Sequence, residues 1–289
     1  MSLFRIGANI QAMDSLRSLY GLNEEISSRQ SRLASGKRIN TARDDTAGYA
    51  IAKSLEGRAH GLNAALSNVQ NAQSLLAIAE GGYQNQMDIL QTIKDKTVQA
   101  ADRAVSDKQR KSIDAQVFQL LTELDEIGAQ TKWSGTSLIN TAGATNRTFS
   151  FHVGGDKGEE LLVELAKSNS SLMGLGAVAT KLGAGTIGTP TVGTGVDGAD
   201  DAIALVTDAI DTLAGFIQTV GDTMVRLGKK SDFLSVSRNN TDAVRSQYED
   251  ADFAVEQMEL LKLQILQGTS VSALSQANSA PQVVLGLFR

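Results

Sequence analysis

Apolar residues recur every seven positions between residues 62 and 97 of this chain. Large residues occupy one position of each heptad, and mostly alanine occupies a second position three residues later. The first set is Leu62, Val69, Leu76, Tyr83, Leu90 and Thr97, and the second is Ala65, Ala72, Ala79, Gln86 and Ile93. This is the pattern of a coiled-coil helix, and its small residues allow a partner helix to approach closely.

Two further segments show the same periodicity. The shorter one contains Ile113, Val117, Leu120, Leu124 and Ile127. The longer one contains Val206, Ile210, Leu213, Ile217, Val220, Met224, Leu227 and Leu234. An ordinary amphipathic helix is the alternative, but its 3.6-residue period drifts by about 20° per heptad and loses such a pattern over five heptads. The fold class predicted is therefore mainly α: a long antiparallel coiled coil or helical bundle.

Both ends of the chain predict one amphipathic helix each. Residues 8–34 place Ala12, Leu16, Leu19, Ile26 and Leu33 on one face. Residues 251–280 form a single apolar stripe of Val255, Met258, Leu261, Ile265, Val271 and Leu274. Isolated helices are marginal in water, so we expect the two ends to pair with each other or with other copies of the chain.

The centre of the chain differs from the flanks. Twelve of the 27 glycines lie between residues 141 and 200. Residues 148–153 alternate polar and apolar, residues 154–158 are turn-forming, and residues 161–165 are typical of a second strand, which predicts a β-hairpin. Residues 183–200 predict a Gly/Thr-rich loop, with Asp200 or Asp201 capping the helix that follows.

Composition narrows the function classes. The 289 residues suggest about two domains. The chain has no cysteine, which excludes disulfides, thiolate metal sites and a cysteine nucleophile. A net charge of -5 does not favour nucleic acid. The sequence contains no run of about 18 apolar residues, so no transmembrane helix is predicted. The first nine residues lack the apolar core of a cleaved signal peptide.

Candidate enzyme chemistry is weak. Two G-x-G-x-x-G matches, 183–188 and 193–198, lack the strand and helix context of a dinucleotide site. His60 and His152 have no further ligands at zinc spacing, and no nucleophile-elbow pattern is present. We therefore expect no catalytic residue, no cofactor and no metal.

A local basic stretch lies beside two acidic residues. It contains Arg29, Arg32, Lys37, Arg38 and Arg43, followed by Asp44 and Asp45. Because both signs of charge are present, interface salt bridges explain this stretch better than a phosphate-binding track.

Several motifs carry a family resemblance. The stretch from Arg32 to Gly48 (RLASGKRINTARDDTAG), continued by residues 49–52, closely resembles the N-terminal signature of bacterial flagellin. Residues 133–139 (WSGTSLI) and 249–254 (EDADFA) resemble family segments before the hairpin and before the terminal helix. Residues 275–278 (SQAN) and the end of the chain from Pro281 (PQVVLGLFR) resemble the family's C-terminus. The likeness covers residues 1–180 and 200–289.

The resemblance implies a layered subunit. Residues 1–43 with 252–289 would form an inner coiled-coil layer that is disordered in the monomer and orders on assembly. Residues 44–182 with 201–251 would form a helical bundle with a β-hairpin, and the loop 183–200 would stand in place of outer domains. The function implied is a structural, non-enzymatic subunit of the extracellular filament that serves swimming motility, here slim and comparatively smooth.

The resemblance also implies sites and partners. The main partner would be the chain itself, as a helical homopolymer. The others would be a flagellar type III export apparatus, a C-terminus-binding chaperone, a filament cap and hook-associated proteins. The expected subunit-interface residues are Leu16, Leu19, Ile26, Arg32, Leu33, Arg38, Asp44, Asp45, Val255, Met258, Leu261, Ile265, Leu274, Leu285, Leu287 and Arg289.

One further partner follows from the resemblance. Many flagellins bind the innate receptor Toll-like receptor 5 through a helix segment of the pattern L-Q-R-[VI]-R-E-L. Here the segment continues from Leu90 as Gln91, Thr92, Ile93, Lys94 and Asp95, followed by Lys96. Because a threonine cannot supply the two parallel hydrogen bonds of an arginine, we expect weak recognition.

Three alternatives remain at this point. A hook–filament junction protein shares similar terminal helices, although the RLASGKRIN stretch and the terminal segment favour flagellin. A flagellin carrying an inserted hydrolase would need 100 or more additional residues, which 183–200 cannot hold. An adhesin would rest on surface exposure alone.

Overall fold

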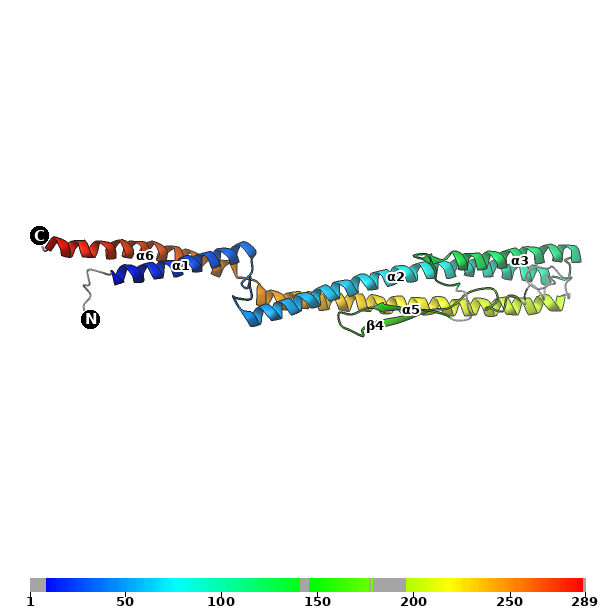
Figure 1. Cartoon of the computed structure of the whole chain (residues 1–289). Helices are drawn as coiled ribbons and strands as arrows, with labels where there is room; N and C mark the ends of the chain where they lie inside the picture. Colours follow the sequence, from blue (N-terminus) through cyan, green and yellow to red (C-terminus); the bar gives the residue numbers. More distant parts are fainter. Residues whose placement is uncertain (1–8, 141–145, 177, 179–195, 288–289) are drawn as a thin grey trace. The chain divides into compact units, whose positions relative to one another are not determined.

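The computed structural model describes residues 9–140, 146–176, 178 and 196–287, and leaves the side chains of residues 107, 196–198 and 280–287 undescribed. The helices are α1 (Ile10–Ser35), α2 (Thr46–Ala101), α3 (Asp107–Gln130), α5 (Val196–Glu249) and α6 (Phe253–Leu287). The strands are β1 (Lys132–Trp133), β2 (Thr136–Ser137), β3 (Arg147–His152) and β4 (Glu160–Leu165). Figure 1 shows these elements, and they confirm the prediction of a mainly α chain with a small hairpin region.

The chain divides into two compact units. One unit contains residues 1–59 and 239–289, and the other contains residues 60–238. The first unit therefore combines both ends of the chain, and the second combines the part of α2 from residue 60 and the part of α5 up to residue 238 with α3 and the strands.

The loop predicted at 183–200 differs from the structure at its end. Residues 183–195 lie outside the described residues, but α5 already begins at Val196. Asp200 and Asp201 are consequently inside the helix, so the prediction that one of them is the cap was wrong. Glycines at 195 and 198 concealed the start of the helix, because glycine is a poor helix former.

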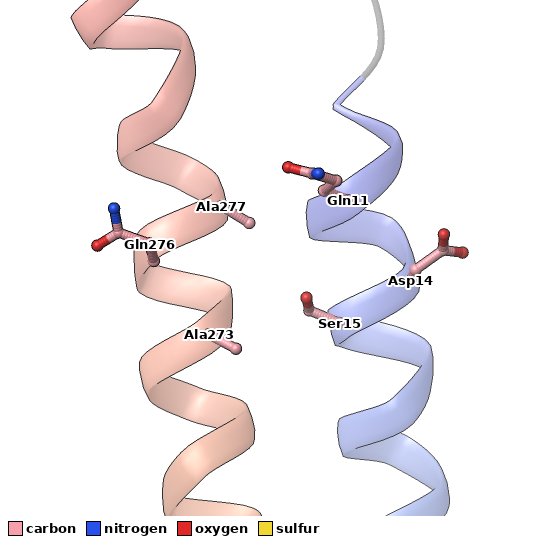
Figure 2. A pocket seen from close by; sticks show the side chains of 6 residues that line it. All are labelled: Gln11, Asp14, Ser15, Ala273, Gln276 and Ala277. Atoms are coloured by element: carbon pink, nitrogen blue, oxygen red, sulfur yellow. The ribbon is translucent and has the colours of Figure 1, made fainter. Parts of the chain in front are cut away.

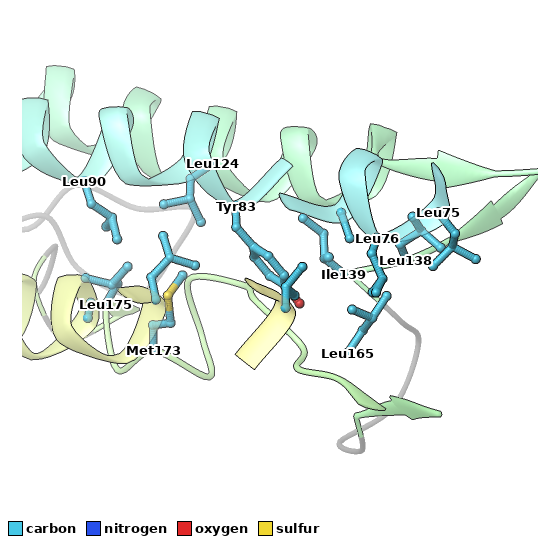
Figure 3. Close-up of a cluster of buried hydrophobic side chains, with 14 of the residues drawn as sticks. Leu75, Leu76, Tyr83, Leu90, Leu124, Leu138, Ile139, Leu165, Met173 and Leu175 are labelled. Atoms are coloured by element: carbon cyan, nitrogen blue, oxygen red, sulfur yellow. The ribbon is translucent and has the colours of Figure 1, made fainter. Parts of the chain in front are cut away.

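The seam predicted along α2 forms the centre of the second unit. Its six large positions and the five positions three residues later are all buried, and Val69, Leu76, Tyr83 and Leu90 have no exposed surface. Figure 3 shows Leu76, Tyr83 and Leu90 of this seam together with Leu124 of α3 and with Met173 and Leu175 of the segment that follows the hairpin. The heptad interpretation of this helix is confirmed.

The other two seams contribute to the same core. On α5, the residues at seven-residue spacing are buried, while the intervening Ile210, Ile217 and Met224 are half-buried. Val206, Leu213, Val220, Leu227 and Leu234 make up that buried set. On α3, Ile113, Val117 and Leu124 are buried, and Leu120 and Ile127 are half-buried. The prediction missed the buried Leu121, which lies four residues after Val117.

Contacts between α2 and α5 define an antiparallel pair. The rings of Tyr83 and Phe216 have centroids 6.0 Å apart, and Arg238 Nη1 donates a hydrogen bond to Asn63 Oδ1 at 3.2 Å. Residue numbers thus rise on one helix as they fall on the other. The Tyr83 hydroxyl donates to the carbonyl oxygen of Ala166, and burial raises the pKa of Tyr83.

The predicted hairpin is present as β3 and β4. The strands pair antiparallel from Arg147 opposite Leu165 to His152 opposite Glu160. Val163 and Leu165 are buried, while Phe149 and Phe151 are half-buried and pack against the same core. The hairpin therefore places one face against the bundle.

A second, smaller hairpin was not predicted. The strands β1 and β2 are joined by Ser134 (φ 49°) and Gly135 (φ 79°). A two-residue connection with positive φ at both residues matches the right-handed twist of paired strands, and glycine adopts that conformation without a steric penalty. The strands are two residues long, too short to show a hydrophobic alternation.

Buried polar groups attach the segment after β4 to the bundle. The Ser168 hydroxyl donates to Gln86 Oε1, whose amide nitrogen donates to the Leu124 carbonyl at 3.0 Å. The backbone N–H of Ser170 donates to the Asp125 carboxylate at 2.7 Å. These hydrogen bonds connect α2, α3 and the chain after the hairpin inside one core.

Candidate interaction surface

The helices α1 and α6 pair antiparallel inside the first unit (Figure 1). Near the start of α1, the Asn9 side chain donates a hydrogen bond to the carbonyl of Ala277 at 2.7 Å. Toward the end of α1, Arg29 donates a hydrogen bond to Glu256. Between them, Ile26, Leu260 and Leu263 are buried together, with Leu22 and Leu33 packed against them. The two ends of the chain thus contact each other, which is one of the two pairings expected from the sequence.

The side of each helix that faces its partner follows a strict heptad. On α1, every residue of the set is buried or half-buried: Ala12, Ser15, Leu19, Leu22, Ile26, Arg29 and Leu33. On α6 the same holds for Glu256, Leu260, Leu263, Gln267, Ser270, Leu274 and Ala277, which we call the inner seam. Alternating spacings of three and four residues are typical of coiled-coil packing.

A single acidic residue interrupts the apolar side of this interface. Glu256 has 7% of its side chain exposed, and its carboxylate contacts two arginines of α1. Arg29 Nη1 lies 2.8 Å from Oε2, and Arg32 Nη1 lies 3.6 Å from Oε1. The Arg32 side chain, predicted at a subunit interface, is thus engaged within its own chain.

The apolar stripe predicted for α6 lies on the other side of that helix. Val255, Met258, Leu261 and Ile265 are exposed, with Ile265 at 69% and Met258 at 62%. The prediction of one stripe was wrong, since α6 has two apolar faces, and of the stripe residues Leu274 belongs to the inner seam. We call Ala254, Met258, Leu261, Ile265, Gly268 and Ser272, which follow their own heptad, the outer seam.

On α1 too, some of the predicted interface residues are covered by α6 and others are exposed to solvent. Ile26 is buried and Leu19 and Leu33 are half-buried against α6, whereas Leu16 is 39% exposed. Met13 and Tyr20 are also exposed, each at 67%. Both terminal helices therefore present large apolar side chains to solvent.

The connections α1–α2 and α5–α6 are bonded to each other. The Arg38 N–H donates to the Glu249 carbonyl at 2.6 Å, and the Ala251 N–H donates to the Gly36 carbonyl at 3.0 Å. Lys37 Nζ lies 2.6 Å from Glu249 Oε1, and Arg38 Nη2 donates to the Tyr248 carbonyl. Gly36, at φ 71°, ends α1 in the left-handed conformation that favours glycine.

The adjacent residues Asp44 and Asp45 both accept hydrogen bonds from backbone N–H groups of neighbouring residues. Asp44 accepts hydrogen bonds from the backbone N–H groups of Asn40 and Thr41, and the Thr41 bond contributes most to lowering the pKa of the Asp44 carboxyl. Asp45 accepts from the Gly48 N–H at the start of α2. In the same region, Lys37 pairs with Glu249 and Arg32 pairs with Glu256 within the chain. The salt bridges expected at an interface stay a prediction.

A small open groove separates the distal parts of α1 and α6 (Figure 2). It is lined by Gln11, Asp14, Ser15, Ala273, Gln276 and Ala277. Small side chains on facing turns leave this end of the helix pair less filled than the part around Ile26. No charged pair or convergent set of catalytic groups lines it.

The remaining predicted sites are placed as follows. In the receptor segment, Gln91, Thr92 and Asp95 are exposed, Lys94 is half-buried and Ile93 is fully buried. Leu285 and Leu287 belong to α6 without described side chains, and Arg289 and both G-x-G-x-x-G loops up to residue 195 lie outside the described residues.

The tertiary structure brings no candidate catalytic or metal-binding residues together among the residues that it describes. His60 and His152 are both exposed, and the described part of the chain holds no group of three metal-ligating side chains. By length and composition, α5 contains one segment apolar enough to cross a membrane. Its seam residues, such as Val206 and Leu213, are buried in the bundle.

The described residues form two helical units, and both terminal helices carry uncovered apolar side chains. Comparison with known proteins places the chain in a family. Residues 6–144 match the bacterial flagellin N-terminal helical region, and residues 203–288 match the bacterial flagellin C-terminal helical region. The chain belongs to the bacterial flagellins.

Curated relatives match over nearly the full length. The chain is 32% identical to a flagellin of Listeria innocua, over 98% of this chain and 99% of the relative. It is 30% identical to the flagellar filament 30.7 kDa core protein of Treponema maltophilum, with the same coverage. A flagellin of Bacillus subtilis is 31% identical over 99% of this chain and 100% of its own length.

A solved structure shares the fold. It is described as a putative flagellar hook-associated protein from Vibrio parahaemolyticus, with a TM-score of 0.60 and 14% identity. The match covers 72% of this chain and 100% of that structure. At this identity the likeness concerns the fold alone.

Proposed function

We propose that this chain is a structural subunit that polymerises into the extracellular bacterial flagellar filament and serves swimming motility, without catalytic activity. The relatives named flagellin and flagellar filament core protein support this proposal, because they match from end to end. The observation that carries the proposal is the outer seam of α6.

The outer seam is suited to a neighbouring subunit. It is displaced from the inner seam by two residues, and two residues correspond to about 200° around a helix. The two apolar seams therefore lie on nearly opposite sides of α6, one against α1 and one in solvent. A helix that packs on two opposite sides extends an assembly, and a repeated contact that does not close into a ring gives an open filament.

The terminal helices order on assembly in this proposal. Among the described residues, Ile26, Leu260 and Leu263 alone form the buried apolar cluster between α1 and α6. So little burial is weak against the conformational entropy of ordering two long helices, and neighbours that cover the outer seam would supply the rest. The interface residues proposed from the exposed set are Leu16, Val255, Met258, Leu261 and Ile265.

The layered organisation is part of the same proposal. Residues 1–43 and 252–289 would form the inner layer, and residues 44–182 and 201–251 would form the bundle around it. The glycine-rich stretch 183–200 would occupy the place of outer domains. Export through the flagellar type III apparatus, a chaperone that binds the C-terminus, and cap and hook-associated proteins would complete the partners.

Electron microscopy of the polymerised protein tests the function. We expect filaments from the full chain and none from a chain lacking residues 255–289. A single substitution, Ile265→Lys, should also abolish filaments, because it buries an unpartnered charge in the outer seam. The control is Gln264→Lys, which adds the same charge at the neighbouring exposed position outside both seams. Normal filaments from the truncated chain or from Ile265→Lys would refute the terminal-helix mechanism.

A hook–filament junction protein is the second candidate, and the fold of the hook-associated structure supports it. Abundance separates the two functions. A filament subunit is present in thousands of copies in sheared filaments, and a junction protein in a handful per filament. The near full-length flagellin relatives favour the filament subunit.

We also propose weak recognition by Toll-like receptor 5. Thr92 is exposed and lacks the arginine guanidinium of the family pattern, and Ile93 is buried in the core and offers no contact surface. A receptor reporter-cell assay should show low potency, and full potency would contradict the proposal.

A further inference from the structure

We infer that the contact of Glu256 with Arg29 and Arg32 decides which of the two apolar faces of α6 packs against α1, and in which register. The inference rests on the proposed function, because it specifies the face that stays available for a neighbouring subunit. It is carried by the placement of these charges on the two seams.

Each seam of the α1–α6 interface contains one charged residue. On α6 the inner seam has Glu256 followed by leucines and small or uncharged residues, and on α1 the seam has Arg29 among apolar and small residues. These two residues meet at 2.8 Å, and Arg32, one turn away from Arg29, contacts the second carboxylate oxygen. The charges therefore match in one alignment of the two helices.

A shift of one heptad removes this match. The antiparallel alignment places Glu256 beside Arg29 and Leu260 beside Ile26. Sliding α6 by seven residues in one direction brings Glu256 against Leu22, and sliding it in the other brings Arg29 against Leu263. Removing one partner of a buried ion pair is strongly destabilising, because it leaves an uncompensated charge. A polar residue at a single seam position is known to fix register in coiled coils for this reason.

A rotation of α6 about its axis fails for the same reason. The outer seam, Ala254, Met258, Leu261, Ile265, Gly268 and Ser272, contains no charged residue. If α1 packed on this face, Arg29 would lie among apolar side chains and Glu256 would be turned away from it. The apolar residues alone do not discriminate, since both faces repeat with the same heptad spacing. The contact of Glu256 with Arg29 and Arg32 therefore favours packing of α1 on the inner seam of α6. No charged residue of the outer seam favours packing of α1 there.

The experiment uses disulfide pairs, since the chain has no cysteine of its own. In the full chain, Leu22→Cys with Leu263→Cys reports the inner face, and Leu22→Cys with Ile265→Cys reports the outer face. The quantity measured is the ratio of the two intramolecular disulfide yields after oxidation, in polymerised protein or, if none forms, in the free chain. We expect a ratio of about ten or more with Glu256 present, and of about three or less in Glu256→Leu, because the mismatch penalty disappears with the charge.

Two variants separate this role from simple packing. Glu259→Leu is the matched control, since Glu259 lies three residues further along α6 and its ion pair is to Lys262 of the same helix. It should leave the ratio unchanged. Exchanging the charges with Glu256→Arg, Arg29→Glu and Arg32→Glu together should restore the ratio lost in Glu256→Arg alone.

Failure of this inference and failure of the proposed function give different experimental results. An unchanged ratio in Glu256→Leu, or no inner-face disulfide in the unsubstituted background, overturns the inference even where filaments form. Absence of filaments from the full chain contradicts the proposed function and, with it, the ordering of the terminal helices on assembly. The ratio of disulfide yields is then read in the free chain and still tests the role of Glu256.

Discussion

The central bundle and the terminal helix pair use the same heptad spacing but differ in how completely they cover their apolar residues. Among the residues that the structure describes, 31 apolar residues from α2, α3, α5 and the connecting segments of the bundle form one buried cluster. Between the described parts of α1 and α6, three residues do so. The bundle has a third helix and a hairpin to cover the faces that a two-helix pair leaves open. The terminal pair covers one side of each helix, and its other apolar residues stay in solvent.

The difference indicates which region is stable alone. Burial of apolar surface is the main favourable contribution to folding, at about 25 cal/mol per Å². Among the described residues, the bundle buries far more apolar surface within a single chain than the terminal pair does. Substitutions in the two regions should consequently have different readouts.

The largest expected effect is that of Tyr83→Ala in the bundle. Tyr83 has no exposed surface, its ring lies against Phe216, and its hydroxyl is hydrogen-bonded to Ala166. Truncation of a large buried aromatic side chain costs about 3–5 kcal/mol. Urea unfolding followed by circular dichroism measures the loss. The matched control is Tyr20→Ala on α1, which is 67% exposed and should change stability by less than about 0.5 kcal/mol.

A smaller loss is expected from Ser168→Ala. This variant leaves the buried Gln86 Oε1 without the hydroxyl that donates to it, and an unsatisfied buried acceptor costs about 1–3 kcal/mol. The same unfolding assay applies. Ser67→Ala is the control, because its hydroxyl donates to a backbone carbonyl of its own helix at an exposed site. Equal stability of the two variants would show that the buried hydrogen bond contributes nothing specific.

Asp114→Asn should raise the stability of the bundle in a pH-dependent way. Asp114 is 7% exposed, its Oδ1 has no hydrogen-bond partner in the described part of the chain, and burial raises its pKa to about 6, against a smaller lowering by Arg110. Its ordinary pKa is 3.8, so the folded state holds a proton that the unfolded state has lost between about pH 4 and pH 6. Wild-type stability therefore falls as pH rises through this window.

The Asn variant lacks that penalty. The free energy of unfolding of the Asn variant should equal that of wild type near pH 4 and exceed it by about 1–2 kcal/mol above pH 7. Urea midpoints measured from pH 4 to pH 8 test this. A constant difference across that range would mean that Asp114 ionises without cost in the folded bundle.

The smallest effect on global unfolding is expected from Ile26→Ala. Ile26 belongs to the buried cluster between α1 and α6, and truncation should loosen that pair. The urea midpoint of the bundle should move by an amount equivalent to less than about 0.5 kcal/mol, while amide hydrogen exchange in α1 accelerates. A shift above about 1 kcal/mol would show that the two regions unfold as one cooperative unit.

Sequence patterns predicted the bundle well for a physical reason. Along α2, every position that the period assigns from Leu62 to Thr97 is buried, and along α5 the residues at seven-residue spacing from Val206 to Leu234 are buried. Leu75 and Ala209 are buried as well, outside the predicted positions. The β3–β4 hairpin was also predictable, since polar and apolar residues alternate and turn residues follow. The two-residue strands β1 and β2 are too short to carry such a signal.

Prediction of the candidate interaction surface was less successful. In α6, apolar residues follow two interleaved heptads, and each of them contains large side chains: Leu260, Leu263 and Leu274 in the inner seam, and Met258, Leu261 and Ile265 in the outer seam. Periodicity locates both faces but does not say which one meets α1. Arg32 and Asp44 form bonds within the chain in the structure, and their predicted role between subunits stays a prediction.

By itself, the sequence determined the helical class, the seam residues of the bundle, the hairpin and the family resemblance, because these depend on local period and motif. Only the tertiary structure decided which side of α6 is covered by α1, that Glu256 faces Arg29 across more than two hundred residues, and that α5 begins before Asp200. These features depend on pairing between distant segments, and a local pattern does not encode the identity of its partner.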